Sequence, residues 1–254
     1  MHPAEREARP EAAPLPWVCR MMQACDSAYP TGAYAHSAGL EGLVQAGVVR
    51  DAATLESFLH GQFLPQLARC ELPLAAAAWE AAGGTGGMVG AAEVPGGGPD
   101  WGRLRELCLL GRALRGTREL RAASEAVGRQ RLEMASLLHG GLASEFQARA
   151  REGGWPVPSC VAAGVEGRLL GAPREAVLQA LLYAAVSGLV AAAMKLLRLG
   201  QNAVQRLVAG GLANCNELLD TACSLTDAEL GSFNPWWDIA SSRHERADFR
   251  LFIS

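Results

Sequence analysis

The feature that most constrains the fold is a long uncharged segment, which runs from Ala176 to Met194 between Glu175 and Lys195. A helix through this segment would be long enough to cross a bilayer. Its content is mainly small residues, however, and no aromatic belt or basic flank sets an orientation in a membrane. A helix without charge suits the centre of a bundle equally well, where amphipathic helices surround it. We therefore predict a buried central helix, and a single membrane span is the alternative.

The rest of the chain predicts more helices and no sheet. Half of the residues are apolar but only 6% are aromatic, so the core must be built mainly from Leu, Ala and Val. Leu and Ala are strong helix formers. Apolar residues recur at helical spacing in 55–63, 101–114 and 117–138, and Asp51 and Thr54 are candidate caps for the first of these segments. The predicted fold is all-α, a single-domain helical bundle with a central apolar helix.

Two segments are expected to lie outside the bundle. Residues 1–16 are rich in Pro, Ala and charge, which predicts a disordered leader without the apolar stretch of a signal peptide. Residues 83–99 are rich in glycine and predict a flexible loop between helices, within one folded domain that spans 17–254.

The composition excludes several classes of function. The formal charge is only −3 and no block of basic residues occurs, which argues against a nucleic-acid partner. Lys195 is the single lysine and does not follow a glycine-rich loop, so a nucleotide-binding P-loop is absent. No triad spacing indicates a catalytic residue. Seven scattered cysteines without a Cys-x-x-Cys pair predict neither a zinc site nor a disulfide framework, and they suit the cytoplasm.

Four blocks, in order along the chain, carry the specific information. The first is 26–41, in which Pro30 and Gly32 predict a turn that leads into a helix, with Tyr34, His36 and Ser37 near the start of that helix. The others are the arginine-rich helix that begins at 117–124, the segment 199–205, and the C-terminal tail 238–254.

Together these blocks resemble the UreF family of urease accessory proteins. The first block meets nearly every fixed position of the family's N-terminal signature, at Asp26, Ser27, Pro30, Gly32, Tyr34, His36, Ser37, Gly39 and Glu41. Three departures stand out: Arg198 replaces a usual Pro, Val204 replaces a usual Gly, and 157–160 lacks a His-Pro pair that many members carry.

The resemblance implies a cytoplasmic, all-helical protein that tends to dimerise and catalyses nothing itself. Members bridge a GTPase, UreG, and a scaffold protein, UreH (also called UreD), which contacts apo-urease, and the assembly delivers nickel as its cargo. The missing P-loop agrees with this division of labour, because nucleotide hydrolysis belongs to UreG. No tightly bound cofactor and no metal ligand are predicted in this chain, since a single histidine such as His36 beside a turn is more often structural.

The predicted partner-binding residues are Tyr34, His36, Arg250, Leu251 and Phe252. An extended backbone would place Phe249, Leu251 and Ile253 on one face of the tail and Arg250 and Phe252 on the other. So apolar a tail must dock on its own bundle, on a second copy or on another protein. Arginine suits an interface because its guanidinium offers a rigid set of donors. The alternative function is that of a generic helical adaptor in an unrelated complex.

Overall fold

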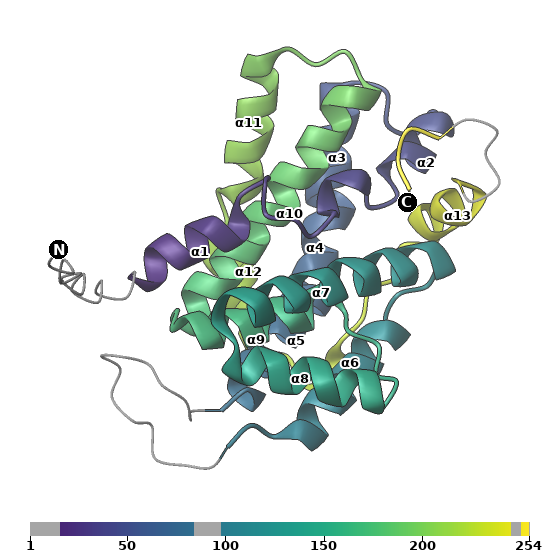
Figure 1. Cartoon of the computed structure of the whole chain (residues 1–254). Helices are drawn as coiled ribbons and strands as arrows, with labels where there is room; N and C mark the ends of the chain where they lie inside the picture. The colour runs from purple at the N-terminus through teal and green to yellow at the C-terminus, as the bar shows by residue number, and fades with distance from the viewer. Residues whose placement is uncertain (1–15, 84–97, 245–249, 254) are drawn as a thin grey trace, which may run out of the picture.

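The uncharged segment lies in helix α10 (Arg174–Leu196), which runs through the middle of the computed structural model (Figure 1). The structure describes residues 16–83, 98–244 and 250–253. α10 contacts α1, α2, α5, α9, α11 and α12, so the prediction of a central apolar helix in an all-α domain is confirmed. The described residues contain helices and no strand.

The helices follow one another with short connections. Their bounds are α1 Trp17–Cys25, α2 Leu40–Gln45, α3 Ala52–Phe58, α4 Leu64–Gln66, α5 Leu72–Ala81, α6 Trp101–Ala113, α7 Arg118–His139, α8 Gly141–Glu152, α9 Ser159–Leu170, α11 Gln201–Leu212, α12 Cys215–Ser224 and α13 Pro235–His244, with single 3-10 turns at Ala33–Ala35 and Asp227–Glu229. The predicted helices at 101–114 and 117–138 are therefore confirmed as α6 and α7. Most of the predicted leader and loop, and residues 245–249 of the tail, lie outside the described residues.

One face of α10 is buried and the other is exposed. Leu178, Leu182 and Val186 are fully buried in the main core, whereas Tyr183 is 50% and Met194 45% exposed. Among the described residues α10 is the one helix long and apolar enough to cross a membrane, and 44% of its apolar 18-residue window is buried. Its exposed residues include Gln179, Tyr183 and Met194 as well as the small residues Gly188 and Ala191.

The helical run from α3 to α5 is continuous but widens twice. The Leu64 N–H donates to the Leu59 carbonyl and the Leu72 N–H to the Leu67 carbonyl, which are π-helical bonds within Leu59–Phe63 and Leu67–Glu71. A proline, Pro65 or Pro73, follows each of these bonds directly. Because proline lacks an N–H and its ring collides with the carbonyl four residues earlier, a wider turn lets the helix pass it without breaking.

The start of this run confirms the predicted cap. The Asp51 side chain accepts the Thr54 N–H at 2.8 Å, and the Thr54 hydroxyl oxygen accepts the Asp51 N–H at 3.1 Å. Two backbone donors of the first turn are thus satisfied, which is the capping box expected of a well-defined helix start.

Helix α9 is buried between α5, α7 and α10 and holds the main polar contact of the interior. The Glu166 side chain is 1% exposed. Its carboxylate accepts the Tyr29 hydroxyl at 2.6 Å and forms an ion pair with Arg131 of α7. Arg131 also donates to the Ala24 carbonyl at the end of α1, at 3.0 Å. This network therefore ties α1 and the segment after it to α7 and α9.

We expect Glu166→Leu to destabilise the protein by about 3–5 kcal/mol, because it leaves the Arg131 charge buried without its counter-charge. Combining it with Arg131→Met should recover most of that loss, since a buried ion pair replaced by apolar groups of similar volume costs little. Urea unfolding followed by circular dichroism measures both values.

The control for Glu166 is an exposed pair. Arg103 holds Asp227 through two bonds of 2.6 and 2.8 Å, with side chains 31% and 49% exposed. Arg103→Met should cost no more than about 1 kcal/mol. If Glu166→Leu and Arg103→Met lowered the free energy of unfolding equally, the interpretation that burial makes Glu166 important would be contradicted.

Candidate functional site

The N-terminal signature folds as an irregular turn, and α2 begins later than predicted. Tyr34 lies in the 3-10 turn Ala33–Ala35, and His36 and Ser37 are extended or in a turn before Leu40, where α2 starts. We expected all three residues near the start of one helix, but Tyr34 lies in a separate 3-10 turn, and His36 and Ser37 precede α2 by four and three residues. The reason is that Ala38 has φ +53° and the next residue φ +80°, so two left-handed residues separate the turn from the helix.

Helix α13 lies directly against α2 (Figure 1). Trp237 is buried, its ring packs edge-on against Phe58 at 5.1 Å, and its Nε1–H donates to the Ala38 carbonyl at 2.9 Å. Gly42 permits the close approach, because a Cβ there would lie 2.5 Å from the Ala240 carbonyl oxygen. The strained backbone at Ala38 is therefore held by a contact from the other end of the chain.

The C-terminal tail is bound to α2 by one carboxylate. Glu41 is 3% exposed and accepts the Leu251 N–H at 2.7 Å and the Phe252 N–H at 2.9 Å. The Ile253 N–H donates to the Ala35 carbonyl at 2.9 Å. Hydrogen bonds to a buried carboxylate are among the stronger ones in proteins. Two such bonds and the bond to the Ala35 carbonyl therefore fix the tail at three successive amides.

The side chains of the tail alternate as an extended backbone requires. Phe252 is 5% exposed and lies under Lys195, whose Nζ is 5.1 Å from the centre of the ring. Leu251 and Ile253 point outward and are 53% and 65% exposed. Of the three places on which the tail could dock, the structure therefore has it on its own bundle.

The five predicted partner-binding residues come together around this tail. Arg250 pairs with Glu119 of α7 at 3.5 Å, and Glu119 also acts electrostatically on His36. Tyr34 is 73% exposed in the turn whose Ala35 carbonyl binds the tail. Residues more than 200 positions apart in the sequence thus meet at one surface, which we call the tail patch: Tyr34, His36, Arg250, Leu251 and Ile253. Phe252, also predicted to bind a partner, lies buried beneath this surface.

Burial lowers the pKa of His36 below its ordinary value, while the neighbouring Glu119 carboxylate acts in the opposite direction. The ring is consequently neutral at pH 7. Burial raises the pKa of the Asp238 carboxyl, which lies close to Gly116, just before α7.

No three His, Cys, Asp or Glu side chains gather as a metal site within the described part of the chain.

Sequence reasoning missed three residues that position the tail patch, namely Glu41, Glu119 and Lys195. Glu41 was visible as a member of the signature, and Lys195 as the single lysine, but neither observation indicated a role. A carboxylate that binds main-chain amides leaves no pattern in the tail, because every residue except proline offers the same N–H.

We expect Glu41→Gln to loosen the tail while the bundle stays folded. The neutral side chain loses the charge-assisted bonds and turns one N–H donor toward another, at a cost of about 1.5–3 kcal/mol. Amide hydrogen exchange at Leu251 and Phe252 should accelerate at least about tenfold, with α10 amides unchanged. Glu217→Gln, at an exposed position of α12, is the control. Unaltered exchange in the tail of Glu41→Gln would refute the assigned role of Glu41.

Comparison with known proteins identifies the family of the chain. The family model UreF matches residues 49–210. The chain is 34% identical to the urease accessory protein UreF of Azorhizobium caulinodans, over 89% of this chain and 90% of that protein. It is 36% identical to the protein of the same name from Azoarcus sp. (strain BH72), over 92% of this chain and 94% of that protein. On this evidence the chain belongs to the UreF family of urease accessory proteins.

Proposed function

We propose that this protein is a nickel-insertion chaperone that bridges the GTPase UreG and the scaffold protein UreH (UreD) while the nickel centre of urease is assembled. It acts by binding and carries out no catalysis. Nickel is cargo of the complex, GTP hydrolysis belongs to UreG, and the assembly contacts apo-urease in the cytoplasm. A homodimer is the proposed working form.

The tail patch is the observation that carries this proposal. Tyr34, Leu251 and Ile253 are large side chains that the bundle leaves more than half exposed, although it binds the backbone beside them tightly. Rigid, exposed apolar side chains next to an arginine are typical of protein-binding surfaces. The patch also joins the first and the last of the blocks that resemble the family, which supports a shared role for them in binding.

Reconstitution tests the proposal directly. Purified apo-urease, UreG and UreH are mixed with Ni²⁺, bicarbonate and GTP, with and without this chain, and urease activity and bound nickel are measured. We expect activation to require the chain and the chain alone to hydrolyse no GTP. Full activation without the chain would overturn the proposal. Failure to bind either protein would favour the generic adaptor instead.

We expect Arg250→Ala to leave the fold intact but to weaken binding of UreG and lower urease activation. Arg250 is 43% exposed but its partner Glu119 is only 10% exposed, so loss of the ion pair should cost about 1–3 kcal/mol and leave the bundle folded. If Arg250 anchors the interface, affinity should fall about 30-fold, which corresponds to about 2 kcal/mol. Titration calorimetry with UreG measures this effect.

Arg206→Ala is the matched control for Arg250, since Arg206 is an exposed arginine on α11, away from the tail patch. The Arg206→Ala variant should bind UreG with the same affinity as the unaltered chain. Unchanged co-purification of Arg250→Ala with both partners would remove Arg250 from the proposed interface.

A further inference from the structure

Exposed arginines gather where α6 meets α7. Arg112 of α6 and Arg129 of α7 pair with the same carboxylate, that of Glu125, at 3.4 and 3.8 Å. The two arginine side chains are 54% and 60% exposed, whereas the Glu125 side chain is only 14% exposed. The negative charge is therefore largely covered, and the two positive charges face solvent.

The positive surface continues along α6. Arg105 and Leu109 precede Arg112 by seven and three residues, so the three side chains lie on one face of the helix. Arg105 is exposed and Leu109 is 44% exposed. The two arginines are thus about 10 Å apart along the helix axis, with an apolar side chain between them.

The segment before α9 holds α6 and α7 at a fixed distance from each other. A Cβ at Gly111 of α6 would lie 2.9 Å from the Pro158 ring, and one at Gly128 of α7 would lie 2.0 Å from the Val157 carbonyl oxygen. Only glycine at these two positions lets the segment pack so closely on both helices. The exposed arginines therefore stand on a rigid framework, which lowers the entropy cost of binding a partner.

The outward side of α7 links these arginines to the tail patch. Glu119, Ala122, Ala126 and Arg129 recur at spacings of three and four, and the last three are exposed. Glu119 pairs with Arg250 of the tail patch, about 15 Å along the axis from Arg129. Because alanine side chains are small, a segment of another protein can approach α7 closely here. The following residues together are called the arginine face: Arg105, Leu109, Arg112, Ala122, Ala126 and Arg129.

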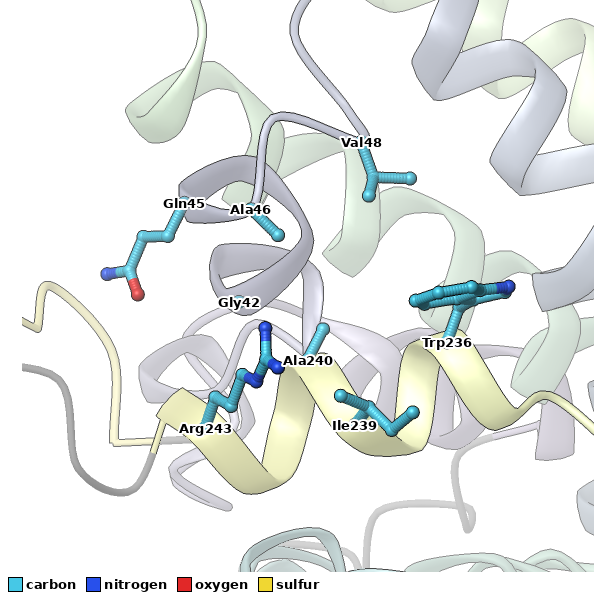
Figure 2. Close-up of a pocket in the computed structure, with 8 residues that line it drawn as sticks. All are labelled: Gly42, Gln45, Ala46, Val48, Trp236, Ile239, Ala240 and Arg243. Carbon is cyan, nitrogen blue, oxygen red and sulfur yellow. The ribbon is translucent and has the colours of Figure 1, made fainter.

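Clustering distinguishes this surface from a single exposed arginine. Arg243, for comparison, lies at one end of a groove of about 350 Å³ between α2 and α13, and the other residues that line that groove carry no charge (Figure 2). The arginine face instead presents three guanidinium groups around one mostly covered carboxylate, although the chain as a whole carries −3. Such a surface is complementary to carboxylates, which guanidinium groups can bind through two parallel bonds.

We propose that the arginine face binds an acidic segment of UreG, as a continuation of the contact proposed for Arg250. A helix of UreG with carboxylates two turns apart matches the spacing of Arg105 and Arg112, and an apolar side chain between those carboxylates meets Leu109. UreG is the occupant because the exposed side of α7 leads from Arg250 to Arg129, so a protein bound at the tail patch also reaches this face. The inference rests on the proposed function and deepens it with a charge requirement on UreG.

Calorimetric titration of purified UreG into variants of the full chain tests the proposal. We expect Arg112→Gln combined with Arg129→Gln to weaken UreG binding at least about tenfold at low salt. At about 0.5 M NaCl its affinity should differ from that of the unaltered chain by less than about threefold, because salt screens exposed charges. Arg105→Glu leaves Glu125 with both of its partners and should weaken UreG binding by a similar factor, with an unchanged unfolding midpoint.

Arg206→Glu on α11 is the matched control, because it changes the net charge by the same amount as Arg105→Glu at an exposed position outside the arginine face. It should bind UreG as tightly as the unaltered chain does. If the unaltered chain does not bind UreG, the proposed function fails. If it binds, and the arginine-face variants bind as tightly as Arg206→Glu, the arginine face has no such role and the proposed function stands. Loss of UreH binding alone, or a changed oligomeric state in sedimentation, would also overturn the proposal, because the face would then hold a different occupant.

Discussion

The carboxylate of Glu41 holds the C-terminal tail against α2. A buried carboxylate is tolerated only when its oxygens are hydrogen-bonded, and here the donors are main-chain amides of Leu251 and Phe252. α2, which carries Glu41, has six residues, too few to form a stable helix by itself. Its position depends on α13 on one side and on the tail on the other. The tail patch inherits its geometry from this arrangement.

Much of the fold could be predicted because its signals are local. The Asp51 cap, the helices at 101–113 and 118–139 and the alternation of the tail all follow from patterns within a few residues. The start of α2 could not be predicted in this way. Ala38 adopts a left-handed conformation that alanine disfavours, and the hydrogen bond that accompanies it comes from Trp237. Such a contact between distant residues has no trace in the signature itself.

Contacts in the interior of the protein are also difficult to predict from local sequence patterns. Helix α10 was predicted to be central because it lacks charge, but lack of charge does not reveal which sides are covered. Small residues can face either a neighbouring helix or solvent, and on α10 they do both. Glu166 illustrates the converse. A lone carboxylate in the apolar segment of α9 indicates a buried partner, yet Tyr29 and Arg131 cannot be identified as that partner without the packing of α7 and α9.

The site residues were found by resemblance, and the structure adds the reason why they belong together. The tail patch lies where α2 meets the C-terminal tail. In the proposed bridging function, holding two partners close would raise the effective concentration of each for the other. Such a function needs rigidity at the contact surfaces, which the Glu41 bonds and the inward face of α13 supply.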